Sequence, residues 1–158
     1  MFEITTHALH NSGDFTIEGE IPYITRTTFN NGVAKYVDEA ETKEIVSGNA
    51  ITIAGETAKL YYQPYDFVVG TKVSIMRYET INRENAMYAI SAIEKSISSQ
   101  FGFSNILTGK KLKELTITLP ATSSGDPDWE YMENYIKMIE KQEKRKISNY
   151  VEHKRNNF

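Results

Sequence analysis

Two stretches of the sequence carry side chains that could hold a metal ion. The first is the pair His7 and His10, spaced by two residues and followed by Asp14, which would supply half of a metal site. Two histidines and one carboxylate on a loop are a weak ligand set, and surface histidines are the simpler interpretation. No metal site is therefore assigned to these residues.

The second stretch has the order of side chains used by metal-dependent nucleases. Asp38 precedes Glu41-Thr42-Lys43, and in such nucleases two carboxylates hold a divalent ion while the lysine polarises a water molecule. Triplets of this kind also arise by chance in charged loops, so a solvated acidic loop is the alternative interpretation. A small metal-dependent nuclease remains one hypothesis for the function.

Other catalytic motifs are absent from the sequence. The nine glycines are dispersed and form no phosphate-binding loop, and there is no GxSxG nucleophile elbow. The residues that place an adenine or cytosine beside a methyl donor are also missing. The chain has no cysteine, which removes disulfides and thiolate metal sites and fits a cytoplasmic protein. We therefore predict no catalytic residue, no metal and no cofactor, and a protein that is not itself an enzyme.

Composition places limits on any binding function. The 158 residues are 40% hydrophobic, enough for the core of one domain. Residues 130–158 hold seven Lys/Arg and five Asp/Glu, whereas residues 1–129 hold eleven and sixteen. An acidic body repels a duplex on average, so DNA would have to bind a local patch. No apolar run approaches the ~20 residues of a membrane span, and no secretory signal is recognisable.

The elements that would position the polar side chains change type along the chain. Period-two alternation predicts strands at residues 2–4, 21–25, 50–54, 59–63 and 68–76, and Asn31-Gly32 predicts a sharp turn after the second of them. Apolar steps of three and four predict a helix over residues 83–99, with Asn82 as its N-cap. Residues 115–119 alternate again and predict a last strand before Pro120.

A long helix is predicted from its N-cap, Asp128, to about Asn156. One stripe of this helix is apolar at steps close to a heptad repeat, which is typical of a coiled coil. The stripe consists of Trp129, Met132, Ile136, Ile139, Ile147 and Tyr150. The predicted fold class is α+β, with a β-rich domain and one packed helix over residues 1–126 and a coiled-coil-forming helix over residues 127–158.

Several segments, taken in order, resemble a known family. They are Gly19-Glu20-Ile21-Pro22-Tyr23-Ile24-Thr25-Arg26, Asn30-Asn31-Gly32-Val33, Gly48-Asn49-Ala50-Ile51-Thr52-Ile53, Tyr62-Gln63 with Phe67, Leu115–Pro120 and Pro127-Asp128-Trp129-Glu130-Tyr131-Met132-Glu133. Their order and spacing resemble the target-recognition domain in specificity (S) subunits of type I restriction–modification enzymes and of BcgI-like enzymes. A usual S subunit carries two such domains, each followed by a long helix. This chain has room for one unit, so it resembles a half-subunit or a piece that holds one half.

The resemblance implies DNA recognition without catalysis. In that family the S subunit reads DNA, and separate subunits or domains supply S-adenosylmethionine-dependent adenine methylation and cleavage. The expected partners are double-stranded DNA, a methyltransferase (modification) subunit and, in some systems, a restriction subunit. Recognition loops differ most between members, so candidate DNA contacts are chosen from side-chain chemistry and loop position. They are Thr25, Arg26, Thr27, Asn30, Asn31, Lys35, Gln63, Lys72, Arg77, Lys110 and Lys111.

A second copy of the chain is expected to cover the apolar stripe of the long helix. An uncovered apolar seam favours association, and two copies would form a two-fold symmetric antiparallel pair. At 1.5 Å per residue the helix would span roughly 40 Å, close to the ~34 Å between DNA half-sites one turn apart. The alternative functions are a coiled-coil interaction module without DNA binding and the small nuclease described above. For the turn that holds Thr25-Arg26-Thr27-Thr28 and Asn30-Asn31, ordinary turn chemistry is the alternative to base contacts.

Overall fold

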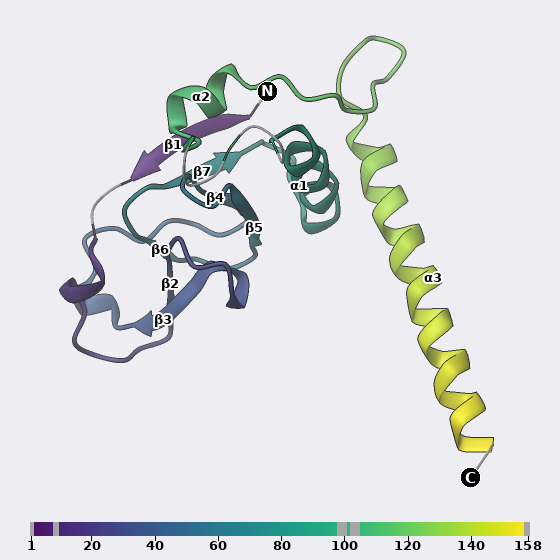
Figure 1. Cartoon of the computed structure of the whole chain (residues 1–158), viewed down its shortest axis with the longest axis horizontal. Coiled ribbons are helices and arrows are strands. Elements are labelled where there is room, and N and C mark those ends of the chain that lie inside the picture. The colour runs from purple at the N-terminus through teal and green to yellow at the C-terminus, as the bar shows by residue number, and fades with distance from the viewer. Residues whose placement is uncertain (1, 8–9, 98–100, 102–104, 157–158) are drawn as a thin grey trace.

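Two small β-sheets and one covering helix make the body of the molecule, and a long helix extends from it (Figure 1). The computed structural model describes residues 2–7, 10–97, 101 and 105–156. The strands are β1 (Glu3–His7), β2 (Ile21–Ile24), β3 (Val33–Val37), β4 (Ala50–Ala54), β5 (Lys59–Gln63), β6 (Val68–Val69) and β7 (Val73–Arg77). The helices are α1 (Arg83–Ile97), α2 (Gly109–Glu114) and α3 (Trp129–Asn156). Short 3-10 turns lie at Ser12–Asp14, Asn30–Gly32 and Glu39–Glu41.

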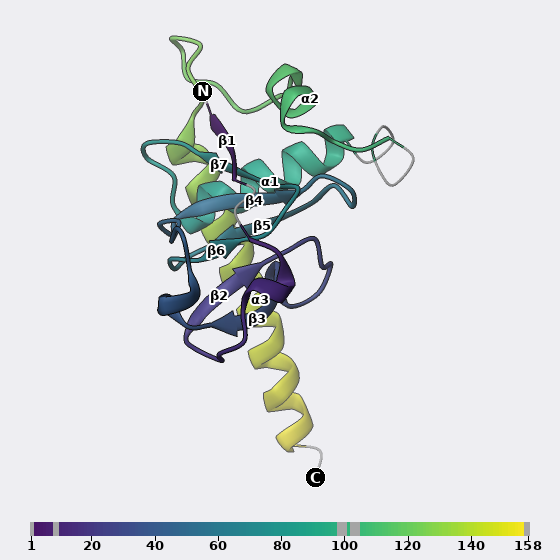
Figure 2. The ribbon, with the colours of Figure 1, turned by 90° about the vertical axis from the view of Figure 1, so that its left-hand side faces the viewer.

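The four-stranded sheet has the order β1-β7-β4-β5, and its neighbours are all antiparallel. The three-stranded sheet has the order β3-β2-β6, with β2 antiparallel to β3 and parallel to β6. All of β4 is buried because the first sheet is covered on both faces, by α1 on one and by the second sheet on the other (Figure 2). Residues Ile51 and Ile53 pack toward the α1 side, whereas Ala50 packs with Phe67 and Ile75 on the other side.

Most of the predicted elements are confirmed, with small differences in extent. The predicted strands at 21–25, 50–54 and 59–63 correspond to β2, β4 and β5, and the predicted 83–99 helix corresponds to α1. Residues 98–99 of that helix lie outside the described residues. The capping prediction also holds, because Asn82 Oδ1 accepts a hydrogen bond from the backbone N–H of Asn85 at 3.0 Å. Asn85 Oδ1 accepts one from the Asn82 N–H in return, at 2.9 Å.

Three sequence-based predictions need correction. The single strand predicted at 68–76 is two strands, β6 and β7, separated by a turn in which Lys72 has a φ of 62°. Helix α2 and strand β3 were not predicted. The strand predicted at 115–119 is wrong, since this segment belongs to no sheet in the described part of the chain. Its alternation is nevertheless real, because Leu115 and Ile117 pack against the core beneath α1.

Helix α3 has two halves with different surroundings. Asp128 caps it by accepting from the Tyr131 N–H at 2.8 Å, as predicted. In the first half Met132 is fully buried, and Trp129 contacts the rings of Phe2 and Tyr78. From residue 141 to residue 155 every residue is exposed, and this half projects beyond the body (Figure 1). The expectation of an apolar stripe left open along the whole helix is therefore wrong at its start.

No helix in the described ranges is both long enough and apolar enough to cross a membrane.

Candidate nucleic-acid interface

The segment that joins β2 to β3, residues 25–32, is called here the polar turn. Three successive residues in it, Asn30, Asn31 and Gly32, have left-handed backbone conformations with φ of 48°, 54° and 82°. The turn is closed by backbone hydrogen bonds from Thr25 N–H to Gly32 O and from Gly32 N–H to Phe29 O, both 2.9 Å long. Asparagine and glycine tolerate this backbone better than other residues, which explains why the Asn-Asn-Gly sequence stands here.

Two side-chain amides hold the polar turn against the four-stranded sheet. Asn31 Nδ2 donates to Tyr62 O at 2.9 Å and to Gln63 Oε1 at 3.3 Å. In return Gln63 Nε2 donates to Asn31 O and to Thr52 Oγ1, each at 3.0 Å. Gln63 is only 3% exposed, so it supports the turn from beneath and does not reach the surface. Both ends of its amide are engaged within the chain, so the structure assigns Gln63 a supporting role beneath the polar turn.

One carboxylate lies between two of the candidate cations. Glu56, in the turn between β4 and β5, accepts a hydrogen bond from Lys72 Nζ on one oxygen and from Arg26 Nη1 on the other, both at 2.6 Å. Hydrogen bonds from Lys72 and Arg26 hold the pKa of Glu56 below its usual range. This cluster borders an open cavity of about 440 Å³, whose other lining residues are Asn11, Ser12, Tyr23, Thr25, Thr27, Ala34, Thr57, Gly70 and Thr71.

A second open cavity, of about 670 Å³, lies beside the other end of the polar turn. Asn30 and Asn31 line it, together with the aromatic residues Tyr36 and Tyr65. Phe29, at the tip of the turn, is 79% exposed and Tyr65 is 77% exposed. The polar turn therefore presents amides, hydroxyls, a guanidinium and the exposed ring of Phe29, and the exposed ring of Tyr65 lines the same cavity as Asn30 and Asn31. These are side chains able to contact base edges and to stack on bases.

The remaining candidate contacts lie elsewhere and are mostly engaged within the chain. Lys35 Nζ donates to the backbone oxygens of Ser12 and Phe15, at 2.9 and 3.0 Å. Arg77 donates to the backbone oxygens of Ser47 and Gly48. Lys110 is exposed and Lys111 donates to Asn105 Oδ1 and Ile106 O, but both lie in α2, at the opposite end of the body from β2 and β3 (Figures 1 and 2). The structure thus brings together Thr25, Arg26, Thr27, Asn30, Asn31 and Lys72, with Gln63 hydrogen-bonded beneath Asn31. It engages Lys35 and Arg77 in contacts to backbone oxygens and places Lys110 and Lys111 on α2.

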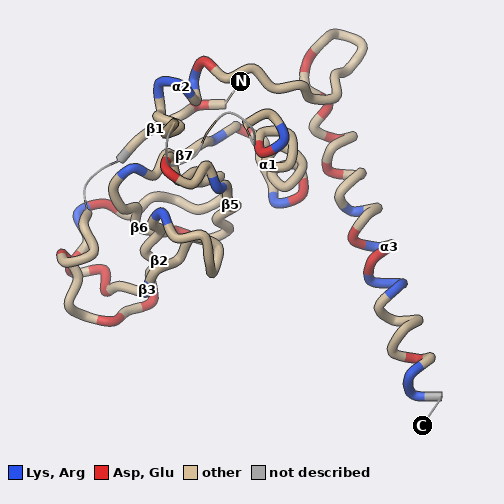
Figure 3. The backbone as a smooth tube through the Cα atoms, in the orientation of Figure 1, with Lys and Arg blue, Asp and Glu red and all other residues tan. Residues whose placement is uncertain are grey.

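Sequence reasoning missed Glu56. The sequence does not indicate the contact between Glu56 and Arg26, because the two residues are 30 positions apart. An acidic residue is also not expected to lie among candidate DNA-binding cations. Figure 3 shows Lys and Arg positions interspersed with Asp and Glu positions along α3, whereas Asp and Glu predominate in the loops beside β3. Any DNA contact must therefore depend on the local arrangement of a few side chains.

The metal-site candidates are engaged in other contacts. His10 is buried, and its Nε2 accepts from the Lys43 backbone N–H at 3.2 Å, so the surface interpretation is wrong for this residue. The side chain of His7 lies outside the described residues. Asp38 caps its own turn, and Glu41 accepts hydrogen bonds from Thr16 and Ile17. Within the described ranges no group of three or more His, Asp or Glu could hold a metal ion, and both carboxylates of the nuclease hypothesis accept hydrogen bonds within the chain.

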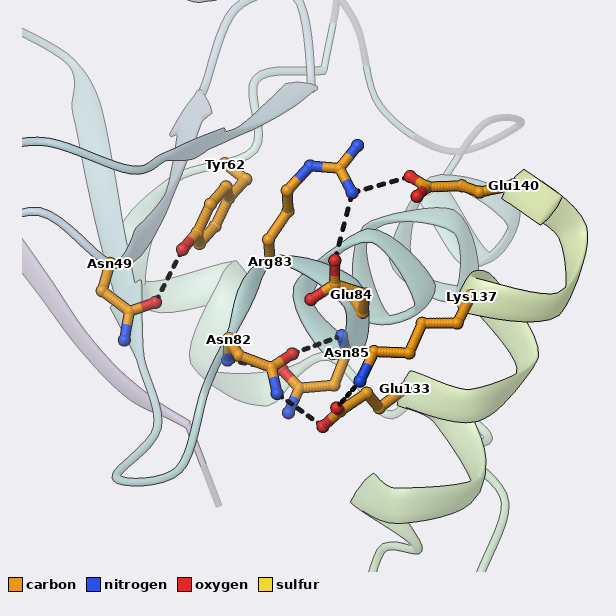
Figure 4. Close-up of polar contacts among 9 residues, drawn as sticks. All are labelled: Asn49, Tyr62, Asn82, Arg83, Glu84, Asn85, Glu133, Lys137 and Glu140. Carbon is orange, nitrogen blue, oxygen red and sulfur yellow. Dashed lines mark hydrogen bonds and ion pairs between the residues drawn. The ribbon is translucent and has the colours of Figure 1, made fainter. Parts of the chain in front are cut away.

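A polar cluster joins the body to α3 (Figure 4). The cap residue Asn82 donates from Nδ2 to Glu133 Oε2 at 2.6 Å, and Glu133 also pairs with Lys137. Seven residues further along α3, about two helical turns, Arg83 Nη1 donates to Glu140 Oε1 at 2.6 Å and also pairs with Glu84. Between the same helices the rings of Tyr88 and Tyr135 meet edge to face, with centroids 5.6 Å apart. These contacts define the direction in which α3 leaves the body.

A family model and a curated relative both relate the chain to the same kind of protein. The family model described as the type I restriction modification DNA specificity domain matches residues 1–149. The specificity subunit S.BcgI of a type II restriction enzyme from Heyndrickxia coagulans is 37% identical over 125 residues, which are 77% of this chain and 36% of that protein.

Two solved structures show the same fold at low sequence identity. The HsdS subunit from Thermoanaerobacter tengcongensis matches with a TM-score of 0.63 and 15% identity, over 89% of this chain and 35% of that one. The S subunit of a type I restriction–modification system from M. genitalium matches with a TM-score of 0.56 and 16% identity, over 95% and 40%. The chain thus spans well under half the length of each of these relatives.

Proposed function

Because the chain belongs to the family of type I restriction–modification DNA specificity domains, we propose that it recognises one part of a double-stranded DNA target and directs a partner methyltransferase to it. The observation that carries the proposal is the match of the family model over residues 1–149. The polar turn supports it, since this turn is braced from within and presents base-reading side chains. Residues 1–126 are proposed as the recognition part and residues 127–158 as the spacer and assembly part.

The proposed role is not catalytic. The partner methyltransferase subunit, and in some systems a restriction subunit, would supply methylation and cleavage, so the chain itself is proposed to need no cofactor. Its substrate would be the DNA of the cell, and we expect it to act in the cytoplasm.

A homodimer is proposed to supply the second half of the recognition machinery. The contact is expected in the exposed half of α3, where Ile147, Tyr150 and Val151 are 62%, 63% and 49% exposed. Tyr150 and Val151 lie three and four residues after Ile147, so the three side chains share one stripe of the helix. Trp129 and Met132 are already used inside the body, so they no longer count among the proposed dimer contacts. Ile136 and Ile139, which are half-buried beside α1, can extend the stripe toward the body.

The proposal is tested by binding and methylation with the full chain. A pool of duplexes with a randomised centre is incubated with the chain, and the bound fraction is sequenced. Enrichment of a defined sequence, with an affinity that falls as salt rises, is the expected result because phosphate contacts release counterions. Addition of a cognate methyltransferase subunit should then give adenine methylation at that sequence. Binding without any sequence preference, or methyl transfer by the chain alone, would contradict the proposal.

A further inference from the structure

We infer that Glu56 and Arg26 together read one G·C base pair of the DNA target, with Glu56 as a specificity-determining residue. This inference rests on the proposed function and assigns one element of its specificity. It starts from the unusual position of a carboxylate among the cations and hydroxyl groups beside the polar turn.

The geometry leaves both members of the pair able to bind a further group. The side chains of Arg26 and Lys72 are 40% and 59% exposed, and that of Glu56 is 19% exposed. The contact to Glu56 uses Nη1 of Arg26, and a guanidinium has five N–H donors, so other donors can point away from the pair. A carboxylate has about four acceptor positions, of which the hydrogen bonds from Arg26 and Lys72 use two.

The presence of Glu56 argues against a phosphate as the bound group. A phosphate offers only acceptors and carries negative charge, so a carboxylate beside Arg26 would repel it and would compete for the same donors. A base edge is different because it presents acceptors and donors side by side. A donor and an acceptor held 2.6 Å apart therefore match a base edge better than the DNA backbone.

Among base pairs, G·C matches this arrangement best. In the major groove guanine offers O6 and N7 as acceptors, for which arginine is the commonest partner, and cytosine offers its N4 amino group as a donor to Glu or Asp. Arg26 would donate to the guanine while Glu56 accepts from the paired cytosine. Lys72 keeps Glu56 ionised and therefore able only to accept.

The cavity beside Arg26 and Glu56 is suited to binding a polar group. Its lining includes the threonines Thr25, Thr27, Thr57 and Thr71. The buried Oγ1 of Thr57 has no hydrogen-bond partner within the described part of the chain, which is costly unless a bound group or water supplies one.

The test compares the sequence preferences of matched variants of the full chain. Wild type, Glu56→Gln, Arg26→Lys and the control Glu39→Gln select from the same pool of duplexes with a randomised centre. Glu39 is exposed in its own turn, so its substitution makes the same change of net charge away from the cavity. We expect Glu56→Gln and Arg26→Lys to lose roughly tenfold preference at the same G·C position and to keep the others, whereas Glu39→Gln retains the full preference.

The outcomes separate this inference from the proposed function. If Glu56→Gln keeps every preference, weakens all positions equally, or changes a position that is not G·C, the inference is wrong while the proposed function stands. A uniform loss would mean that Glu56 only stabilises the turn. If the wild-type chain enriches no sequence, both fail. Thermal unfolding of all four proteins shows whether any loss follows from unfolding.

Discussion

Arg83, the first residue of α1, donates from Nη1 to Oε1 of Glu140 in α3 at a distance of 2.6 Å. The contact joins residues 57 positions apart and lies about two helical turns along α3 from the pair of Asn82 and Glu133 (Figure 4). The two contacts together hold α3 at two points separated along its axis, so they restrain the angle of α3 as well as its position.

The first prediction concerns this angle. Arg83 is half exposed, and exposed ion pairs contribute at most about 1 kcal/mol, so Arg83→Ala should change the free energy of unfolding little. It should nevertheless loosen α3 and widen the range of spacer lengths that a dimer accepts between two half-sites. Selection from duplexes with spacers of varied length measures this. Lys146→Ala, which removes the Glu143 pair in the exposed half of α3, is the control and should leave the range unchanged.

The second prediction concerns Arg26. Its side chain lies at the surface and leaves Lys72 to pair with Glu56 when it is removed, so Arg26→Ala should change the Tm only slightly. Affinity for the preferred duplex should fall by about 1–3 kcal/mol through loss of a base contact. Fluorescence anisotropy measures the affinity for the selected duplex and for a scrambled one, and thermal unfolding measures the Tm. Normal binding by the variant would place Arg26 outside the interface.

The third prediction concerns Gln63. Its buried amide joins the polar turn to the sheet, so Gln63→Ala leaves buried partners unsatisfied and should destabilise the fold by about 1–3 kcal/mol. Urea unfolding gives this value, and Gln142→Ala, the same substitution in the exposed half of α3, is the control. Binding should also weaken at temperatures where the variant is still folded, because the polar turn is less ordered. An unchanged unfolding midpoint would show that the hydrogen bonds of Gln63 make no net contribution to the free energy of unfolding.

The fourth prediction concerns assembly. Ile147→Glu combined with Tyr150→Glu should convert a dimer into a monomer without lowering the Tm of the body, since both side chains are exposed in a single chain. Charging Ile136 and Ile139 is a less specific test, because these residues also lie beside α1. Light scattering at micromolar concentration decides the question, with Asn149→Glu, on the other side of the helix, as the control. A wild-type chain that stays monomeric alone and with the methyltransferase would exclude the dimer.

The fifth prediction concerns pH. Burial, together with the charge of Lys43, lowers the pKa of His10 from 6.5. The neutral ring accepts a hydrogen bond at Nε2 from the Lys43 backbone N–H. A folded-state pKa below the unfolded one means that the stabilisation is present above pH 6.5 and is lost as pH falls through the lowered value. The Tm advantage of wild type over His10→Gln should therefore shrink between pH 8 and pH 5. His153→Gln, in the exposed half of α3, should show no such change.

The sequence predicted what depends on local pattern. Period-two alternation located β2, β4 and β5, and the Asn-Gly pair located the turn because few residues tolerate a left-handed backbone. Helix α2 was missed because its short Gly-Lys-Lys-Leu-Lys-Glu sequence contains a single apolar residue. The break between β6 and β7 was missed because the left-handed residue there is Lys72, whose type gives no such signal.

The candidate site was predicted only in part, because its decisive contacts are long-range. Arg26 was recognised by its chemistry, but its partner Glu56 is 30 residues away and is brought near only by the hairpin of β4 and β5. Gln63 was taken for a surface donor because a glutamine in a strand is usually exposed. Whether a polar side chain faces DNA or braces a loop depends on which face of the strand is covered.

Under the proposed function, the left-handed run at Asn30, Asn31 and Gly32 would limit how the sequence preference of this chain can change by mutation. Most side chains at these three positions would strain the backbone, so substitutions there damage the turn before they alter any base contact. Positions 27–29 have no left-handed backbone, and Thr28 and Phe29 are exposed. A new DNA target is therefore most easily acquired by exchanging side chains at positions 27–29, while the backbone of residues 30–32 stays unchanged.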